Sequence, residues 1–457
     1  MVELQIETAS DLAGRRVVVV GLARTGLAVA EFLLSQGSEV VATDILPAER
    51  LDEQIKTLAT RGAVLELGGH QNETFLEADL IVVSPGVPPT IQPLQMALAK
   101  GVPVIGELEF ASFYVTAPLI AVTGTNGKST TTALIGEILQ AAGRRVFVGG
   151  NIGNPLMNAV NSREKFDLAV VEVSSFQLEG VESFHPKVAL HLNLTPDHLD
   201  RHVHFSAYAE AKARLFSRQT TDDTAILNAD DDQVAAIRTR ARRLMFSRRH
   251  ELGNGAFIKE GKIVLAQGGR PLGELPLEEL SLTGSHNHEN VMAALLAAWA
   301  LGIETETTLE AAARFQGLPH RVEFIGRYGG VRYYNDSKAT NVGAVIRSVE
   351  GFSEPVILIA GGRDKDSDFT LLRPAVRGKV RFMILLGEAR KKMAQALKGT
   401  GDSCFARDMA EAVALARKKA KPGEVVLLSP GCASFDMFTD YAHRGRVFTD
   451  LVRRGDA

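Results

Sequence analysis

Residues 119–130 read Leu119-Ile-Ala-Val-Thr-Gly-Thr-Asn-Gly-Lys-Ser-Thr130, an apolar run followed by a glycine-rich loop. A helical pattern follows to about Gln140. The glycines let the backbone amides of the loop turn toward a polyphosphate, Lys128 can reach the terminal phosphates, and the hydroxyl of Ser129 or Thr130 can bind Mg²⁺. Val122 stands where the full GxxxxGK[ST] pattern has its first glycine, so the loop is a shorter relative of that pattern. A glycine-rich turn with an incidental lysine is the alternative, but the order of strand, loop and helix favours phosphate binding.

Short runs of Val, Ile and Leu recur on both sides of this loop, separated by stretches of helical period. Because these runs do not alternate with polar residues, they predict parallel sheets covered by helices on both faces. The fold class is therefore α/β. At roughly 150 residues per domain, the 457 residues suggest about three domains. Boundaries are expected near residues 107 and 317. The expected strands are 16–20, 39–44, 79–84, 102–106, 119–124, 167–172, 188–193, 224–228, 355–360, 380–386 and 424–429.

The overall composition is that of an ordinary globular protein. The net charge of −3 gives no support to nucleic-acid binding. Only two cysteines occur, Cys404 and Cys432, too few for a disulfide framework, and a reducing cytosolic compartment is expected. The N-terminus has no signal-peptide pattern, and the longest apolar stretch, residues 291–303, is shorter than the roughly 20 residues of a membrane span. No membrane span is therefore expected.

A second glycine motif follows the first predicted strand. Gly21-Leu-Ala-Arg-Thr-Gly26 is similar to the dinucleotide fingerprint GxGxxG, and Asp44 ends the next strand at nearly the distance expected of a ribose contact. Ala23 replaces the middle glycine, which normally allows a pyrophosphate to approach the backbone. The motif therefore argues against NAD. A different nucleotide and a turn without a ligand both remain open.

Two polar segments follow strands of the central series. Glu172 ends an apolar strand, where a carboxylate beside a phosphate loop is well placed for Mg²⁺. The segment 193–200, Asn-Leu-Thr-Pro-Asp-His-Leu-Asp, follows another strand, and four histidines lie at 191, 198, 202 and 204. Zinc is disfavoured because no cysteine and no HExxH pattern is nearby. A magnesium site that includes His198 is favoured, and the other three histidines are expected to be packing or surface residues.

Lysines and amides in the remaining segments are less specific. Lys212 lies in a predicted helix, and the composition of that helix predicts an ordinary solvated lysine. Asn287 and Asn290 stand at the start of a long apolar helix, where they either serve a base or sugar or cap the helix. In the last third, the segments 335–341, 361–365 and 429–438 each lie at the end of a predicted strand or helix. Their polar side chains, which include Lys338, Arg363, Lys365 and Ser434, suit an anionic small molecule.

Taken together, these motifs resemble the Mur ligases over nearly the whole chain. Residues 123–130 look like the ATP loop of that family. Residues 334–341, Tyr-Asn-Asp-Ser-Lys-Ala-Thr-Asn, and 429–436, Ser-Pro-Gly-Cys-Ala-Ser-Phe-Asp, are similar to signatures of its D-glutamate-adding members. The DNPR-type segment of the diaminopimelate- or lysine-adding relatives is absent, and Asn126 stands where the alanine-adding relative usually has His.

The resemblance implies an architecture and a reaction. Residues 1–107 would form a Rossmann-like domain for a uridine-diphosphate substrate, 108–317 a P-loop-type ATPase domain with a mainly parallel sheet, and 318–457 a Rossmann-like domain for the amino acid. It implies that UDP-N-acetylmuramoyl-L-alanine, D-glutamate and ATP give the amide, ADP and phosphate through an acyl phosphate and a tetrahedral intermediate. The implied cofactors are ATP and two Mg²⁺ ions. A monomer in cytoplasmic peptidoglycan precursor synthesis is the family expectation.

The resemblance also assigns residues by motif. Lys128, His198 and Lys212 would be catalytic, with Lys212 carbamylated. The metal ligands would be Ser129, Glu172, His198 and the carbamate of Lys212. The ATP-binding residues would be Gly124, Thr125, Asn126, Gly127, Lys128, Ser129, Thr130, Asn287, Asn290, Arg321 and Asp336. The UDP-substrate residues would be Leu22, Arg24, Thr25, Asp44, Ser84, Gly86 and Asn151. The D-glutamate residues would be Lys338, Thr340, Lys365, Ser434 and Tyr441.

Three rival functions remain open from sequence. The chain could be a different Mur ligase or a folylpolyglutamate synthase, although a folate enzyme would lack the first domain. It could be a nucleotide-binding regulator that hydrolyses ATP as a switch without an acceptor. It could be an NAD-dependent oxidoreductase built on residues 21–26, against which Ala23 argues.

Overall fold

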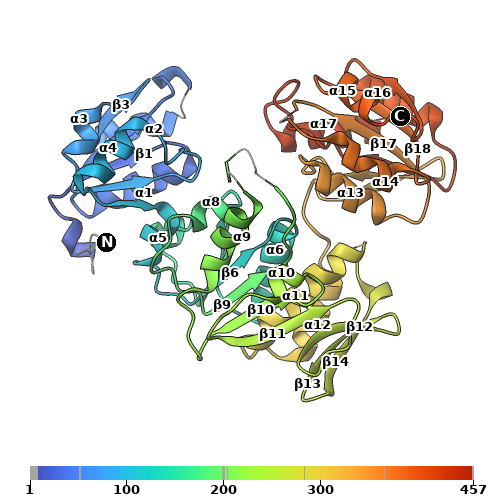
Figure 1. The fold of residues 1–457 in the computed structure, drawn as a ribbon, viewed down its shortest axis with the longest axis horizontal. Helices are drawn as coiled ribbons and strands as arrows, with labels where there is room; N and C mark the ends of the chain where they lie inside the picture. The colour runs from blue at the N-terminus through green and yellow to red at the C-terminus, as the bar shows by residue number, and fades with distance from the viewer. Residues whose placement is uncertain are drawn as a thin grey trace. The chain divides into compact units, whose positions relative to one another are not determined.

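The computed structural model describes residues 9–50, 53–197, 201–202, 204–282, 284–364 and 366–454. Its strands form three separate sheets (Figure 1). By its contacts the chain divides into two units, one of Met1–Glu279 with Glu289–Arg314 and the other of Leu280–His288 with Phe315–Ala457. The first unit contains two of the sheets and the second unit contains one.

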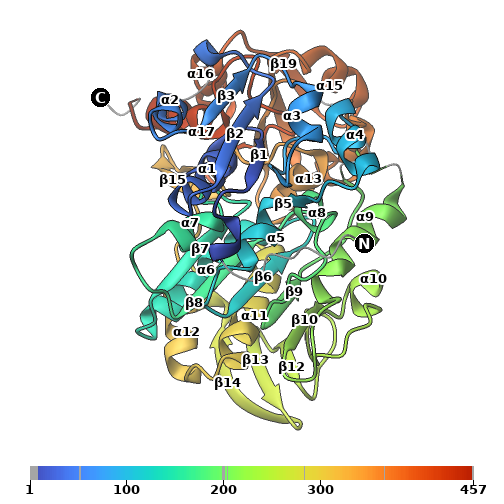
Figure 2. The same ribbon diagram turned by 90° about the vertical axis from the view of Figure 1, so that its left-hand side faces the viewer.

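The N-terminal sheet is parallel and covered by helices on both faces (Figure 2). In β1, Val17 and Val19 belong to one apolar cluster and Val18 and Val20 to another, so the strand is buried on both sides. Its order, β3-β2-β1-β4-β5, reverses direction at β1, which places a crevice between the ends of β1 and β4. The strands are β1 (Arg16–Val20), β2 (Glu39–Asp44), β3 (Val64–Leu67), β4 (Leu80–Val83) and β5 (Val104–Gly106), and the helices α1 (Arg24–Ser35), α2 (Glu53–Thr60), α3 (Asn72–Leu76), α4 (Gln92–Lys100) and α5 (Glu107–Ser112).

The central sheet has nine strands in the order β14-β13-β12-β11-β10-β9-β6-β8-β7. All pairs are parallel except those of β13 with β12 and β14. The strands are β6 (Leu119–Thr123), β7 (Val146–Gly150), β8 (Leu168–Glu172), β9 (Val188–His191), β10 (Thr224–Asn228), β11 (Arg242–Ser247), β12 (Gly255–Lys259), β13 (Lys262–Gln267) and β14 (Arg270–Pro276). The helices are α6 (Lys128–Ala141), α7 (Met157–Asn161), α8 (Ser175–Leu178), α9 (Phe205–Ala213), α10 (Asp232–Ala235), α11 (Ser285–Ala300) and α12 (Thr305–Arg314).

The C-terminal sheet has six strands in the order β15-β16-β20-β17-β18-β19, antiparallel only between β15 and β16. In β17, Leu358 packs into one apolar cluster and Ile357 and Ile359 into another, so helices cover both faces. The strands are β15 (Glu323–Tyr328), β16 (Val331–Asn335), β17 (Val356–Gly361), β18 (Val380–Leu386), β19 (Asp402–Phe405) and β20 (Val425–Leu428), and the helices α13 (Val342–Glu350), α14 (Arg373–Val376), α15 (Arg390–Ala396), α16 (Met409–Lys419) and α17 (Tyr441–Arg454).

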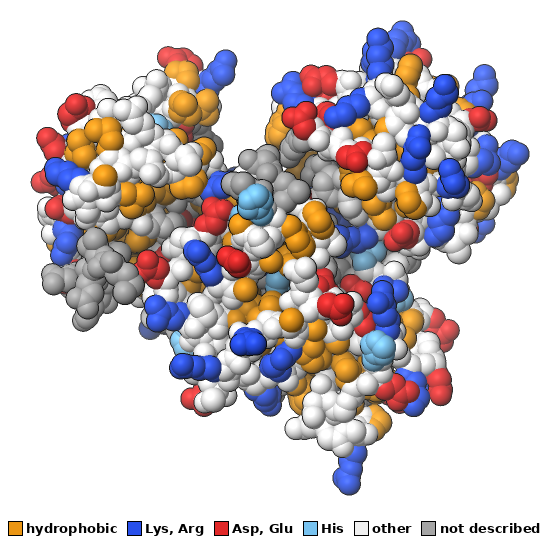
Figure 3. Space-filling model, in the orientation of Figure 1, with side chains coloured by type: hydrophobic (Ala, Val, Ile, Leu, Met, Phe, Trp, Pro, Cys, Tyr) orange, Lys and Arg blue, Asp and Glu red, His pale blue; other side chains and the backbone are white. Residues whose placement is uncertain are grey.

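The prediction of an α/β protein with three sheets is confirmed, including a mainly parallel central sheet. On the face shown in Figure 3, acidic and basic side chains are interspersed over both units. Within the described parts of the chain, no helix is both long enough and apolar enough to cross a membrane.

Candidate active site

The loop between β6 and α6 has the backbone geometry of a phosphate cradle. Gly124 and Gly127 have φ angles of +147° and +87°, in the region that favours glycine. The first turn of α6 begins at Lys128, so its free amide groups and the positive end of the helix dipole lie at the loop. A Cβ at Gly127 would come within 2.2 Å of Asn290 Oδ1. The sequence of the loop therefore meets both a conformational and a packing requirement.

The loop is held in place by the segment after β9. Asn193 Oδ1 accepts a hydrogen bond from the Asn126 amide at 2.9 Å, and Asn193 Nδ2 donates to the Asn126 carbonyl at 3.0 Å. The Thr125 amide donates to the Asn193 carbonyl at 2.9 Å, and Thr125 Oγ1 accepts from the Thr195 amide at 3.0 Å. Asn193 thus shapes the loop, a role that no sequence motif indicated.

Lys128 folds back over its own loop. Its Nζ donates to the carbonyls of Gly124 and Thr125, each at 2.9 Å. The charge is therefore already located inside the loop, where a bound polyphosphate would replace carbonyl contacts with charge-assisted ones.

Ser129, Glu172 and Asn151 form a chain of hydrogen bonds beside the loop. Ser129 Oγ donates to Glu172 Oε2 at 2.5 Å, and Asn151 Nδ2 donates to Glu172 Oε1 at 2.8 Å. Mg²⁺ in phosphate-transfer sites is held by one or two carboxylates, hydroxyls, water and the phosphates themselves. Glu172 and Ser129 fit that donor set. His198 lies outside the described residues, and within the described residues no group of three His, Cys, Asp or Glu side chains could hold a metal by itself.

Lys212 is buried rather than solvated, with 1% of the residue exposed. Its Nζ donates to the Gly124 carbonyl at 2.9 Å and lies 3.4 Å from Thr123 Oγ1. Burial, and after it the charge of Lys128, holds the pKa of Lys212 well below its usual range, although Asp197 and Glu172 act in the opposite direction. The loop carbonyl of Gly124 is thus shared by two lysines, and an unprotonated amine at Lys212 is favoured.

The remaining residues predicted for ATP divide between the two units. Thr125 and Thr130 are buried in the first unit, and Thr131 Oγ1 lies 3.3 Å from Asn290 Oδ1. Asn290 therefore packs against the start of α6. Asn287 belongs to the second unit, where it is buried and its amide donates to the Gly284 carbonyl at 3.0 Å. Arg321 and Asp336 also lie in the second unit.

Gly127→Ala is expected to weaken ATP binding by about tenfold or more, because the new Cβ would clash with Asn290 and Leu192 and shift the loop. The measurement is titration with a fluorescent ATP analogue. Gly143→Ala is the matched control, since Gly143 follows the other end of α6 with φ +76° but has open space around its Cβ position. Equal ATP affinity in the two variants would contradict the prediction.

A second cavity, of about 870 Å³, opens at the crevice of the N-terminal sheet. The structure brings together there six of the seven residues predicted for the UDP substrate: Arg24, Thr25, Asp44, Ser84, Gly86 and Asn151. Leu22 is the exception. It is 1% exposed and packs in the apolar core. Asn151 lines this cavity and also donates to Glu172, so it links the cavity to the phosphate loop.

Asp44 shapes the mouth of this cavity through the backbone. Its two carboxylate oxygens accept hydrogen bonds from the amides of Leu22 (2.6 Å) and Leu46 (2.8 Å). His70 also lines the cavity, although no sequence motif indicated it, and its Nδ1 lies 2.9 Å from Thr43 Oγ1. Burial lowers the pKa of His70, so its ring is favoured in the neutral form.

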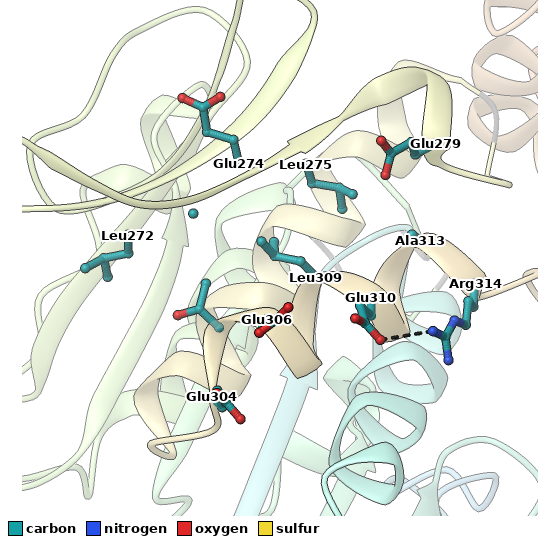
Figure 4. Close-up of a pocket in the computed structure, with 12 residues that line it drawn as sticks. Leu272, Glu274, Leu275, Glu279, Glu304, Glu306, Leu309, Glu310, Ala313 and Arg314 are labelled. Carbon is teal, nitrogen blue, oxygen red and sulfur yellow. Dashed lines mark hydrogen bonds and ion pairs between the residues drawn. The ribbon is translucent and has the colours of Figure 1, made fainter.

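A further hollow, of about 620 Å³, lies between β14 and α12 (Figure 4). Leu309 projects from α12 toward it, and Arg314 pairs with Glu310 at 3.0 Å on the same helix. None of the predicted site residues lines this hollow. Its acidic lining, which repels phosphate, consists of Glu274, Glu279, Glu304, Glu306 and Glu310.

In the second unit, the three polar clusters meet at the ends of β16, β20 and β17, which are neighbours in the sheet. The Gly431 amide donates to the Ala339 carbonyl at 2.8 Å, and the Gly361 amide donates to the Pro430 carbonyl at 2.8 Å. Arg363 pairs with Ala433 through two backbone hydrogen bonds of 2.9 and 3.0 Å. The clusters that the sequence placed at separate strand ends therefore form one site.

The residues predicted for D-glutamate lie around this site. Lys338 Nζ lies 3.7 Å from the centre of the Tyr441 ring, Ser434 is buried, and Thr340 is half-buried. Lys365 lies outside the described residues. Arg444, which the sequence analysis did not single out, donates to Ser337 Oγ and to the carbonyls of Ser337, Cys432 and Ala433 at 2.7–3.3 Å. It joins two of the three clusters, and burial lowers its pKa to about 10.

Asp336 is an internal anchor of the same site. Its Oδ2 accepts hydrogen bonds from Ser348 Oγ (2.6 Å) and Ser429 Oγ (2.8 Å), and its Oδ1 accepts from the Val322 amide at 3.3 Å. Burial raises its pKa to about 6, although the two serines and Arg321 act in the opposite direction. The folded protein therefore binds this proton more tightly than the unfolded chain.

Asp336→Asn is expected to flatten the pH dependence of stability in the second unit. Because the folded pKa of about 6 lies above the ordinary value of 3.8, the wild-type protein gains stability from the protonated carboxyl below about pH 4 and loses it as pH rises through 6. At about 1.4 kcal/mol per pH unit, the difference between wild type and variant changes by up to about 3 kcal/mol. The stability of the second unit is measured by amide hydrogen exchange of β16 and β20. Tryptophan fluorescence does not report on this unit, because Trp299 lies in the first unit. A difference that is constant from pH 4 to 7.5 would contradict the prediction.

Comparisons with known proteins agree with this architecture. Family models described as the Mur ligase MurD-like N-terminal domain, the Mur ligase middle domain and the Mur ligase glutamate ligase domain match residues 15–106, 122–298 and 320–432. A UDP-N-acetylmuramoylalanine--D-glutamate ligase from Geotalea uraniireducens is 48% identical over 98% of this chain and 99% of its own length. Another, from Desulfatibacillum aliphaticivorans, is 48% identical over 97% of this chain and 99% of its own length.

Solved structures are similar in fold. A pseudomurein peptide ligase from Methanothermus fervidus matches with a TM-score of 0.62 and 19% identity over 96% of this chain and 100% of its own. A UDP-N-acetylmuramate-alanine ligase from Thermotoga maritima matches with a TM-score of 0.61 and 19% identity, over 96% of this chain and 100% of its own. The similarity to the Mur ligases that the motifs indicated is confirmed over nearly the full length. The chain belongs to the Mur ligase family.

Proposed function

We propose that this chain is an ATP-dependent ligase that joins D-glutamate to UDP-N-acetylmuramoyl-L-alanine and releases ADP and phosphate. The observation that carries the proposal is the 48% identity to relatives of that name over 98% of the chain. The position of the 870 Å³ cavity also supports the proposal. Asn151 lines this cavity and bonds Glu172 beside the phosphate loop, and the carboxylate of the muramoyl substrate must meet ATP there.

The first step is transfer of the γ-phosphoryl group of ATP to the carboxylate of the muramoyl-alanine substrate. Gly127 and the first turn of α6 would bind phosphate oxygens through amide groups, and Lys128 would neutralise their charge. Asn126 would hold the loop in shape around the phosphates, since its amide donates to Asn193. Mg²⁺ bound by Ser129, Glu172 and His198 would supply further charge neutralisation. Asn151 would keep the Glu172 carboxylate oriented by its hydrogen bond.

The second step is attack of the D-glutamate amine on the acyl phosphate. The lone pair of the neutral amine forms the C–N bond, the nitrogen loses a proton to solvent, the tetrahedral intermediate collapses, and phosphate leaves with the C–O bond electrons. D-glutamate brings two carboxylates, for which Lys338, Thr340, Lys365, Ser434 and Tyr441 are the proposed contacts. Arg444 would position the loops that carry them.

The other assignments follow the same proposal. Residues 1–107 would bind the uridine-diphosphate substrate, 108–317 ATP, and 318–457 the amino acid. Lys212 would carry a carbamate that helps to hold a second Mg²⁺. We expect the enzyme to act as a monomer in the cytoplasm. The ATP contacts would include Asn287, Asn290, Arg321 and Asp336, and the UDP-substrate contacts Arg24, Thr25, Asp44, Ser84, Gly86, Asn151 and the backbone of Leu22.

The test is phosphate release from ATP and Mg²⁺ with UDP-N-acetylmuramoyl-L-alanine, comparing D-glutamate, L-glutamate, L-alanine, L-lysine and no acceptor. Release that requires both the muramoyl substrate and D-glutamate is expected. Release with another acceptor would overturn the choice of amino acid. Release without either substrate would favour a switch ATPase, and no release would overturn the proposed ligase.

A further inference from the structure

His191, the last residue of β9, is a buried imidazole without an assigned task. It is 1% exposed, and neither of its ring nitrogens has a hydrogen-bond partner among the described residues. Buried polar side chains are nearly always hydrogen-bonded, so each exception needs an explanation. A ligand or a modified side chain at this position would provide one.

The strand register places His191 beside the contacts of Lys212. His191 pairs with Thr123 of the neighbouring strand β6, and Lys212 Nζ lies 3.4 Å from Thr123 Oγ1. Two residues earlier, Ala189 and Ala121 lie in the same apolar cluster as Tyr208 and Leu215. Because side chains alternate along a strand, His191 and Thr123 share the face that packs against α9.

Contacts with the segment of α9 and η3 also place His191 near Lys212. The His191 ring stacks on Phe216 with centroids 6.5 Å apart and an angle of 21°. Phe216 follows Lys212 by four residues, one helical turn along the segment of α9 and η3 (Arg214–Phe216). Lys212 Nζ lies 4.7 Å from the centre of the Tyr208 ring. The imidazole and the Lys212 amine therefore both lie between this face of the sheet and the α9–η3 segment.

Burial favours the neutral form of the His191 ring. It is the main cause that holds the pKa of His191 well below its usual range, and the neighbouring Lys212 and Lys128 act in the same direction. A neutral imidazole has one N–H donor and one acceptor nitrogen. The donor has no carboxylate or carbonyl to meet among the described residues, which leaves it available for an acceptor that forms on the neighbouring side chain.

We propose that His191 is a positioning residue that donates a hydrogen bond to the carbamate formed on Lys212. This inference rests on the proposed function, in which Lys212 is carbamylated. The unprotonated Nζ attacks the carbon of CO₂, a C–N bond forms, one C=O electron pair moves to oxygen, and an Nζ proton leaves to solvent. The product has two acceptor oxygens. A donor that is fixed by stacking on Phe216 favours one orientation of that group and slows its loss.

The test is ¹³C NMR of the whole protein with Mg²⁺ and ¹³C-bicarbonate, without substrates. The carbamate resonance is assigned by its loss in Lys212→Ala. His191→Phe and His191→Leu remove the donor, keep an apolar fill, and are expected to require about tenfold more dissolved CO₂ for half-occupancy. His191→Gln keeps a donor and is expected to restore part of the occupancy. His250→Phe, at an exposed histidine of the same unit, is the matched control and is expected to equal wild type.

The outcomes separate this inference from the proposed function. Equal carbamate occupancy in wild type, His191→Phe and His191→Leu would overturn it, as would a wild type without the resonance. Thermal unfolding of each variant shows whether it is folded, and replacement of an unpaired imidazole by an apolar ring is not expected to lower Tm. The ligation assay on the same samples tests the function independently, because a wild type that ligates D-glutamate without a carbamate overturns the role of His191 and the carbamate of Lys212 but leaves the proposed ligase reaction standing.

Discussion

Lys128→Ala is expected to lower kcat by about a thousandfold while the protein remains folded. In the structure, Nζ donates to two carbonyls of its own loop, those of Gly124 and Thr125. In the proposed reaction the same charge faces the transferring phosphoryl group, and loss of one such donor in a water-poor site costs about 10²–10³ in rate. Steady-state phosphate release with saturating substrates measures the effect.

The control for Lys128→Ala is Lys165→Ala, which removes an exposed lysine of the same unit. This variant is expected to turn over like wild type. Circular dichroism and Tm of Lys128→Ala establish that the fold persists, since the carbonyls it leaves can bind water. Near-normal turnover of folded Lys128→Ala would remove the residue from the proposed phosphate chemistry.

Local signals made the sheet framework predictable. Strands such as β1 and β6 are apolar without alternation because both of their faces are buried under helices. The phosphate loop was predictable because its function is contained in contiguous residues. Gly127 has a φ of +87° and is closely packed, and glycine is the residue that satisfies both requirements.

The hairpins of β12, β13 and β14 were not predicted, although turn signals were present. Glu260 and Gly261 have φ angles of +49° and +75°, and Gly268 and Gly269 have +59° and +76°. Two residues with positive φ between antiparallel strands are typical of type I′ turns. Gly268-Gly269 is one of the dipeptides that favour such a turn, whereas Glu260-Gly261 is not, so the sequence indicated the second hairpin better than the first.

Tertiary contacts explain what the sequence could not supply. Asn193 clamps the phosphate loop across 67 residues, and Arg444 binds Ser337 across 107 residues. Neither residue stands in a pattern that indicates its partner. His191 was taken for a packing or surface residue, and its burial beside Thr123 follows only from the pairing of β6 with β9. Lys212 likewise has the local sequence of a solvated helix lysine and is 1% exposed.

Lys212→Ala is expected to lower kcat by about a hundredfold or more and to be rescued in part by a small carboxylate. An ordinary lysine is neutral in only about one molecule in a thousand near pH 7.4. The pKa of Lys212 is lowered by burial first and by Lys128 second, so its amine is prepared to react with CO₂. Alanine removes both the amine and the carbamate and leaves a buried space against Thr123 and Gly124.

Acetate or propionate can occupy that space and present the two oxygens that the carbamate would have supplied, which is why rescue by carboxylate separates a ligand role from a packing role. Phosphate release by Lys212→Ala is measured against increasing acetate, with chloride at equal ionic strength and with Lys165→Ala as controls. Rescue is expected only in Lys212→Ala. Wild type in CO₂-depleted buffer is expected to lose activity and to regain it on addition of bicarbonate.

Normal turnover of Lys212→Ala would contradict any role for the carbamate. A loss of turnover that acetate leaves unchanged would reduce Lys212 to a packing residue. Because the amine of Lys212 shares the Gly124 carbonyl with Lys128, such a packing role would still be transmitted to the phosphate loop.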